Sequence, residues 1–308
     1  MTAYVKNIAH RGGAALWPEN TIIAFSNAID MGADGIELDL QLSSDGALII
    51  YHDDRLRPTN TQRDGKFIQP PGDLVKNLSL AQLQALDVGT DLNRRDNGLF
   101  TAYQGTPVPS WDDFMSLIDA KAPSQFLIYA ELKTSLGETQ ENKALSEAFI
   151  TALAPRKDRE RLHLVSFDWR CINRLRERFP DLNHAYTTLE FSITDPDQPL
   201  PNDRIETHFL RNASQNGAHW FGSYDWRAQK GNSHGEKVLN AISAAQGTGW
   251  FAYWRDITPE RLAQAQALGI KVGAWTVNEQ ANMSRLKAMG IDAIITDRPD
   301  ALKALDSN

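Results

Sequence analysis

Short apolar segments alternate with amphipathic helical patterns along this chain, and the alternation constrains the fold more than any other feature. This alternation predicts an α/β fold, in which helices cover a parallel sheet. Because there are eight βα units, we expect the sheet to close into a TIM (β/α)8 barrel. A barrel of this kind fits 308 residues as a single domain over 1–308. The expected strands are Val5–Ala9, Gly35–Leu40, Phe126–Leu132, Leu162–Phe167, His184–Thr188, Trp250–Trp254, Val272–Val277 and Ala293–Thr296. Helices are expected between them, most clearly at Lys143–Leu153, Cys171–Arg178, Pro259–Leu268 and Gln280–Met289.

Two segments interrupt this rhythm. The turn at Asp45-Gly46 leads into Ala47–His52, and this return is too short for a parallel crossover. We therefore expect a small insertion after the second strand, from residue 44 to about 110, with a short helix at Leu80–Leu86. The long connection from about 189 to 247 is expected to be partly helical.

Composition narrows the partners. The net charge is −7 and basic residues form no block, which argues against nucleic acid. The lone cysteine, Cys171, excludes an intrachain disulfide and gives no support for a thiolate metal site. The sequence contains no apolar run of about 20 residues and no evident signal peptide, so we expect no integral membrane segment and a cytoplasmic location. The oligomeric state is left open.

Acidic side chains with a two-residue spacing suggest a metal site. Glu37 and Asp39 lie two apart on an expected strand, so both side chains point to the same face. Two carboxylates inside a barrel repel each other unless a cation lies between them, and oxygen ligands favour one divalent cation, Mg²⁺ or Ca²⁺. Glu131 would add a third oxygen, and Lys133 beside it would contact phosphate or a carboxylate. The alternatives are a structural ion-pair network at Glu37 and Asp39 and an exposed strand edge at Glu131.

Two histidines lie at ends of apolar runs. His10 follows Ile8-Ala9, and His52 ends Leu48–Tyr51. Imidazoles in this context suit general acid and base catalysis, although a lone histidine is more often structural. Arg11 would bind phosphate if the first strand ends at His10, which Gly12-Gly13 favours.

Other polar and aromatic residues allow two interpretations each. Asn20 would orient a ligand or, like Glu19, cap the first helix. Asp297 would tie the barrel closed, and Trp275 would pack against a glycerol or alkyl group. The remaining histidines are expected to be structural or at the surface: His163, His184, His208, His219 and His234.

The ordered series of motifs resembles the glycerophosphodiester phosphodiesterase family. The matching segments run in family order: Ile8–Gly12, Pro18–Thr21 with Ala24-Phe25, Gly32–Asp39, Asp45-Gly46, His52-Asp53, Glu131–Lys133, Trp275–Asn278 and Ile295–Pro299. The resemblance implies a TIM barrel with an insertion after the second strand. It also implies that His10 and His52 are the acid/base pair, that Glu37, Asp39 and Glu131 bind the metal, that Arg11 and Lys133 lie near phosphate, and that Trp275 lies by the glycerol or alcohol group.

The sequence thus suggests metal-dependent hydrolysis of a glycerophosphodiester to sn-glycerol 3-phosphate and an alcohol, with this small molecule as the partner. Water or the adjacent glycerol hydroxyl would be the nucleophile. One alternative is a phospholipase D-like hydrolase of lysophospholipids or other phosphodiesters, which an apolar groove of Trp220, Trp226, Trp250 and Trp254 would favour. Another is a catalytically silent barrel that binds phosphorylated ligands.

Overall fold

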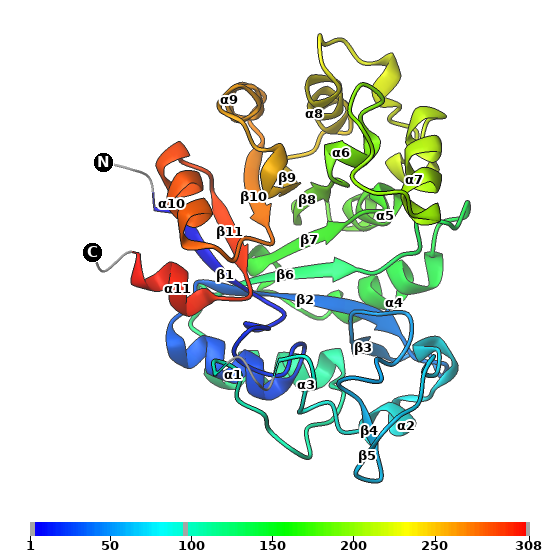
Figure 1. Ribbon diagram of the computed structural model, residues 1–308, viewed down its shortest axis with the longest axis vertical. Coiled ribbons are helices and arrows are strands. Elements are labelled where there is room, and N and C mark those ends of the chain that lie inside the picture. The colour runs from blue at the N-terminus through cyan, green and yellow to red at the C-terminus, as the bar shows by residue number, and fades with distance from the viewer. Residues whose placement is uncertain (1–3, 95–97, 306–308) are drawn as a thin grey trace.

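The central element of the fold is a closed barrel of eight parallel strands (Figure 1). The computed structural model describes residues 4–94 and 98–305. β1 closes the barrel by pairing with both β2 and β11, so the predicted TIM barrel is confirmed. The strands are β1 (Lys6–His10), β2 (Gly35–Leu42), β6 (Leu127–Leu132), β7 (Leu162–Ser166), β8 (Asn183–Thr187), β9 (Gly249–Tyr253), β10 (Lys271–Trp275) and β11 (Ala293–Thr296).

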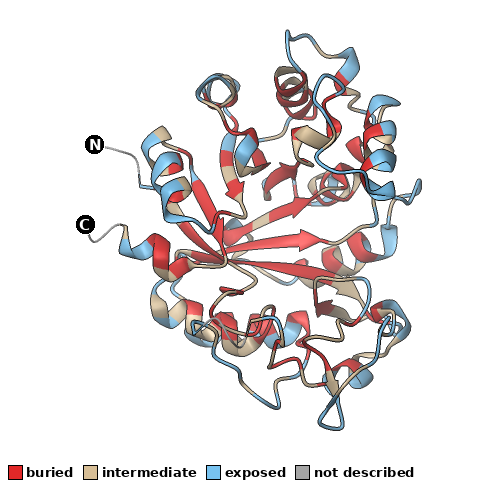
Figure 2. Cartoon of the chain, viewed as in Figure 1, coloured by how far each residue is buried: buried red, intermediate tan, exposed pale blue. Residues whose placement is uncertain are grey.

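Helices surround the barrel and bury their apolar faces against it (Figure 2). They are α1 (Ile22–Met31), α3 (Trp111–Lys121), α4 (Lys143–Leu153), α5 (Trp169–Arg178), α8 (His234–Ala244), α9 (Pro259–Ala267), α10 (Gln280–Met289) and α11 (Pro299–Ala304), with short 3-10 turns η2 (Arg159–Arg161) and η5 (Trp254–Asp256). The predicted cap of the first helix is wrong. Thr21, and neither Glu19 nor Asn20, is the N-cap, and its side chain accepts a hydrogen bond from the Ala24 amide. Asn20 has φ +58°, and its side-chain amide donates to Asp39.

Alternation along each strand separates two packing surfaces. One set of side chains faces outward onto the helices, and the other fills the barrel interior. The inner cluster contains Ile8, Tyr129, Val165, Ala185, Phe251, Ala293 and Ile295, with Leu127 and Trp275 packed against it. The side chains that follow in the same register toward the carboxyl ends of the strands therefore also point into the barrel.

The segment predicted as an insertion lies between β2 and α3. It contains β3 (Leu48–Ile50), β4 (Gln62–Arg63), β5 (Lys66–Phe67), η1 (Val75–Asn77) and α2 (Leu80–Gln84). β3 pairs antiparallel to β2, with Leu40 opposite Ile50, as the short turn requires. The segment has its own apolar cluster, made of Ile49, Tyr51, Leu56, Val75, Leu83, Leu86, Val88 and Val108.

The connection between β8 and β9 is helical in part, as expected. It contains α6 (Phe191–Thr194), α7 (Ile205–Gln215), η3 (His219–Phe221), η4 (Trp226–Ala228) and α8. The four tryptophans whose groove would favour the lysophospholipid alternative form no such groove, since Trp220, Trp226 and Trp250 are buried in the core and Trp254 packs against it. Within the described residues, none of the helices combines the length and apolar character that crossing a bilayer would require.

Candidate active site

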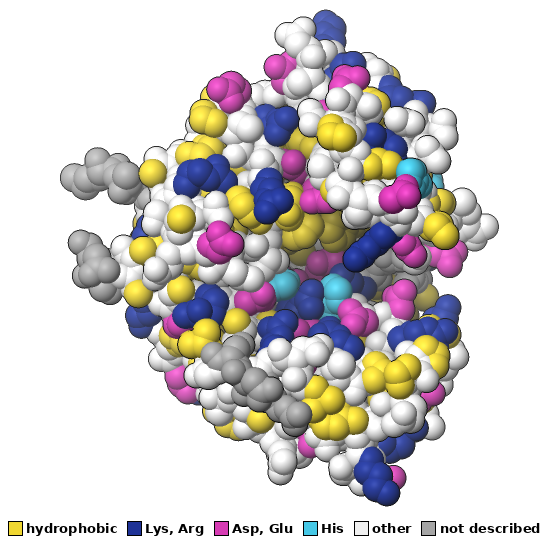
Figure 3. All heavy atoms as spheres, in the orientation of Figure 1, with side chains coloured by type: hydrophobic (Ala, Val, Ile, Leu, Met, Phe, Trp, Pro, Cys, Tyr) yellow, Lys and Arg dark blue, Asp and Glu magenta, His cyan; other side chains and the backbone are white. Residues whose placement is uncertain are grey.

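Polar side chains gather where the strands end, at the carboxyl-terminal mouth of the barrel. Figure 3 shows a hollow with histidine, acidic and basic side chains on one side and hydrophobic side chains on the facing side. The register explains the polar set, because each member continues the inward-facing row of its strand. Its members are His10 from β1, Glu37 and Asp39 from β2, Glu131 at the end of β6, and Lys133 and Asp297 just beyond β6 and β11.

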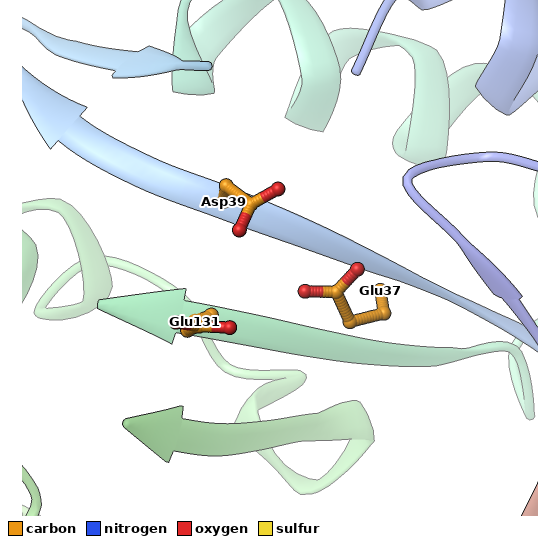
Figure 4. Close-up of side chains that lie close together, drawn as sticks. All are labelled: Glu37, Asp39 and Glu131. Carbon is orange, nitrogen blue, oxygen red and sulfur yellow. The ribbon is translucent and has the colours of Figure 1, made fainter. Parts of the chain in front are cut away.

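Three buried carboxylates converge at the centre of this set (Figure 4). Glu37, Asp39 and Glu131 each offer an oxygen within 4.8 Å of the others, so the predicted ligand set is brought together. Burial and repulsion from the other two carboxylates raise the pKa of Glu37 well above its usual range. A cluster of buried acidic oxygens fits a hard divalent cation, whose charge would relieve this repulsion.

Arg11 reaches the same site as His10 because the chain turns between them. β1 ends at His10, and Arg11 has φ +50°, which swings its side chain back over the mouth. Its guanidinium lies 3.2 Å (Nε) from Asp39 Oδ2 and 2.9 Å (Nη1) from Glu19 Oε1. Gly12 has φ +84°, and a Cβ there would lie 2.8 Å from the Ala24 Cβ, so the turn requires glycine.

Asp39 is held by several donors. Asn20 Nδ2 donates to its Oδ2 at 2.7 Å and so orients this carboxylate, and Lys133 Nζ lies 3.5 Å from its Oδ1. Burial opposes ionisation, but Arg11 and Lys133 outweigh it and hold the pKa of Asp39 well below its usual range. Lys133 also donates to Glu131 at 2.9 Å, and these charges keep its pKa at about 12 despite burial. Lys133 is therefore a partly buried cation facing the carboxylates.

Each of the two histidines has a carboxylate at Nδ1. His10 Nδ1 lies 2.6 Å from Asp297 Oδ1, and its Nε2 lies 3.7 Å from Glu37 Oε2. Asn278 Nδ2 donates to the other oxygen of Asp297 at 2.8 Å. Asp297 thus links the last strand to the first, as predicted, but through the ring of His10.

His52, in the insertion, forms the second histidine–carboxylate pair. Its Nδ1 lies 2.5 Å from Asp53 Oδ1, and Arg57 Nε donates to Asp53 Oδ2 at 2.8 Å. Arg57 Nη2 continues to Glu19 Oε1 at 2.8 Å. The two histidine–carboxylate pairs therefore come from different parts of the chain. In both pairs the bonded Nδ1 leaves Nε2 as the ring nitrogen available to a ligand.

The facing side of the mouth is aromatic. Trp275 packs edge-on against Phe167, with ring centroids 5.6 Å apart, and in a tilted arrangement against Tyr253, with centroids 5.5 Å apart. Trp275 Nε1 donates to the Phe251 carbonyl at 3.1 Å, which fixes the plane of the ring. These rings follow the inward register of β7, β9 and β10, so the predicted Trp275 lies across the mouth from the carboxylates.

Sequence reasoning missed the ion pairs around Glu19, which lie behind this site. Glu19 accepts from Arg11, Arg57 and Arg94, and these cations hold its pKa at about 2 against the effect of burial. Arg57 and Arg94 belong to the insertion, where spacing along the chain gives no hint of their position. The adjacency of Asp53 to His52 was the one signal that could have revealed this group.

Comparisons with known proteins identify the family of this chain. A model of the Glycerophosphoryl diester phosphodiesterase family matches residues 10–301. A glycerophosphodiester phosphodiesterase of Caldanaerobacter subterraneus subsp. tengcongensis is 28% identical, with 96% of this chain and 95% of the relative covered. The chain therefore belongs to the glycerophosphoryl diester phosphodiesterase family, and the predicted resemblance and enzyme class are confirmed.

Solved structures show the same fold. A putative glycerophosphoryl diester phosphodiesterase from Silicibacter pomeroyi has a TM-score of 0.80 at 24% identity, covering 100% of this chain and 95% of that one. An Oleispira antarctica phosphodiesterase, solved in complex with the product sn-glycerol 3-phosphate, has a TM-score of 0.70 at 20% identity. The alignment covers 98% of this chain and 96% of that one.

Proposed function

We propose that this chain hydrolyses glycerophosphodiesters to sn-glycerol 3-phosphate and an alcohol, using one divalent cation and two histidines. The observation that carries the proposal is the pair of imidazoles, His10 and His52, each held at Nδ1 by a carboxylate beside the three buried acidic ligands. The Oleispira relative, solved with sn-glycerol 3-phosphate, supports the product.

The positive groups would hold the phosphate. Glu37, Asp39 and Glu131 would bind Mg²⁺ or Ca²⁺, which stabilises charge on the phosphoryl oxygens when bound. Arg11 and Lys133 lie against these carboxylates and would contact the same phosphate. The diester is an anion, so cations at this point are needed to offset the surrounding acidic side chains.

The histidines would move the protons. Nε2 of one ring accepts the proton of the nucleophile, water or the adjacent glycerol hydroxyl, as its oxygen bonds to phosphorus. The other ring, protonated, gives its proton to the leaving oxygen as the phosphorus–oxygen bond breaks. When water is the nucleophile, it is consumed in this one step, and solvent restores the exchanged protonation states of the two rings. When the glycerol hydroxyl attacks, the product of the step is a cyclic phosphodiester, and a water molecule then opens it with the two rings in reversed roles, which restores their protonation states.

The test is release of sn-glycerol 3-phosphate from glycerophosphocholine. Replacing His10 or His52 by alanine should lower kcat by ~10²–10⁴-fold. His208→Ala is the matched control, because His208 also pairs with a carboxylate, Asp203 at 2.7 Å, but on exposed α7. Near wild-type turnover in either active-site variant would refute the catalytic roles, and undiminished turnover of metal-stripped protein in EDTA would refute the cation.

A second candidate function is phospholipase D-like hydrolysis of lysophospholipids. The aromatic side of the mouth favours it, since Phe167, Tyr253 and Trp275 offer apolar surface beside the charged groups. Comparing kcat/KM for glycerophosphocholine and lysophosphatidylcholine separates the two substrates, because only the second adds an acyl chain.

A further inference from the structure

The segment that carries His52 is held in place by side chains. Residues 51–57 follow β3 and lie outside the regular strands. Gln41 Nε2, on β2, donates to the carbonyls of Tyr51 at 2.7 Å and Asp53 at 3.0 Å. The Arg57 amide donates to the Tyr51 hydroxyl at 2.8 Å. The backbone of this segment is therefore fixed against the barrel, which leaves the orientation of the His52 ring to its own contacts.

One guanidinium bridges two carboxylates behind that ring. Asp53 shares one oxygen with His52 Nδ1 and accepts from Arg57 Nε on the other, at 2.5 and 2.8 Å. Arg57 then reaches Glu19 at 2.8 Å. The side chains of the pair are 30% exposed at His52 and 36% at Asp53, and exposure falls from there to 24% at Arg57 and 9% at Glu19. The chain of contacts therefore anchors a half-exposed pair to a nearly buried carboxylate.

The two histidine–carboxylate pairs differ in what holds the carboxylate. Asn278 donates to Asp297 at the His10 pair, whereas Arg57 donates to Asp53 at the His52 pair. Asp53 is the more exposed of the two carboxylates, so water competes for its oxygens if the guanidinium is removed. The hydrogen bond at one imidazole nitrogen sets which nitrogen carries the proton, and a second partner behind it fixes the ring.

We infer that Arg57 is a positioning residue: by bridging Asp53 and Glu19, it fixes the ring plane of His52 and keeps its proton on Nδ1, so that Nε2 faces the substrate. The kinetic part of this inference rests on the proposed function, whereas the state of the ring does not. The insertion thereby supplies both a proton-transfer group and the residue that orients it.

The fold should survive loss of Arg57. Glu19 keeps two other cationic partners, Arg11 at 2.9 Å and Arg94 at 3.4 Å, and the insertion keeps its own apolar cluster. Arg94 also offers a matched control, since it joins the insertion to Glu19 without a recorded contact to Asp53. Arg57→Gln and Arg94→Gln therefore remove similar contacts to Glu19 but differ at the histidine pair.

The experiment combines ring spectroscopy with kinetics. Nitrogen-15 spectra of the His52 ring at pH 8, assigned with His52→Gln, should show a single Nδ1–H tautomer in the wild type and in Arg94→Gln. Arg57→Gln should show both tautomers in exchange, with kcat for glycerophosphocholine lowered ~10–100-fold and KM within about twofold. Arg57→Lys should lie between the two, because one ammonium group cannot bridge both carboxylates in the same directions.

An unchanged tautomer and unchanged kcat in Arg57→Gln, with only a lower melting temperature, would overturn the inference. Arg57 would then only stabilise the packing of the insertion against the barrel. If Arg57→Gln does not fold, Arg57→Lys decides in the same way, since an unchanged ring spectrum there also overturns it. A wild-type protein without phosphodiesterase activity would refute the proposed function alone, because the ring spectra still test the inference.

Discussion

The two sides of the barrel mouth occupy equivalent positions on their strands but differ in chemistry. β1, β2, β6 and β11 end in histidine, carboxylates and lysine, whereas β7, β9 and β10 end in the aromatic rings Phe167, Tyr253 and Trp275. The backbone treats both sides alike, since the same alternation turns each set inward. Residue type alone therefore divides the mouth into a polar side and an aromatic side.

The two sides of the mouth are stabilised by different interactions. Burial and repulsion between the carboxylates of the polar side raise the pKa of Glu37, and the neighbours of these carboxylates include Arg11 and Lys133. The aromatic side packs ring against ring, with one indole hydrogen bond to Phe251. We expect the polar side to determine turnover and pH response, and the aromatic side to determine affinity for the uncharged part of a substrate.

The largest effect should come from the carboxylates that we propose as metal ligands on the polar side. Glu37→Gln should lower kcat by ~10³-fold, equivalent to about 4 kcal/mol of transition-state stabilisation. In EDTA the same variant should melt at a higher temperature than the wild type at pH 7. The folded pKa of Glu37 is raised, so its contribution to stability is lost as pH rises above the ordinary carboxyl range. Activity assays and thermal melts test both, with Glu147→Gln on the exposed face of α4 as control. A variant that loses activity without gaining stability would show that the carboxylates do not repel in the metal-free protein.

The next effect concerns Glu19, also on the polar side. Its folded pKa of about 2 lies below the ordinary 4.5, so the unfolded chain binds more protons between these values. The stability it contributes is present above pH 4.5 and is lost as pH falls toward 2, a change of about 3 kcal/mol at 1.36 kcal/mol per pKa unit. Urea unfolding from pH 7 to pH 3 should therefore show a shallower pH dependence in Glu19→Gln. Parallel curves for the two proteins would contradict the ion-pair assignment.

The smallest effect should come from the aromatic side. Trp275→Ala should raise KM for glycerophosphocholine ~10-fold and change kcat little, because the lost ring contacts stabilise ground state and transition state alike. Steady-state kinetics test this, with the exposed aromatic Phe209→Ala on α7 as control. A fall in kcat at constant KM would instead place Trp275 with the reacting groups and remove the division between the two sides.

Much of the polar side could be predicted from the sequence because its spacing is local. Glu37 and Asp39 lie two apart on one strand, and Gly12-Gly13 allows Arg11 to turn back beside His10; both arrangements are present. The roles of these residues remain predictions until the variants are measured.

The rest depended on contacts between distant segments. Asp297 meets His10 across 287 positions of the chain, and Arg57 meets Glu19 across 38, which no periodicity records. The sequence also could not show which aromatic residues reach the mouth: Trp220, Trp226 and Trp250 are buried in the core, while Phe167 and Tyr253 line the mouth. Tertiary packing decides such positions.

The pairing of β3 with β2 has a consequence for how this chain tolerates change. Leu40 lies opposite Ile50, and the Tyr51 amide donates to the Asp39 carbonyl at 3.0 Å, so backbone bonds set the separation of His52 from the buried carboxylates. Deleting one residue from the turn at Asp45-Gly46 would shift this ladder by one position and send every following side chain to the opposite face. A deletion in this surface turn would thus displace His52 from the site and abolish activity, whereas a point substitution in the same turn leaves the register of β3 unchanged.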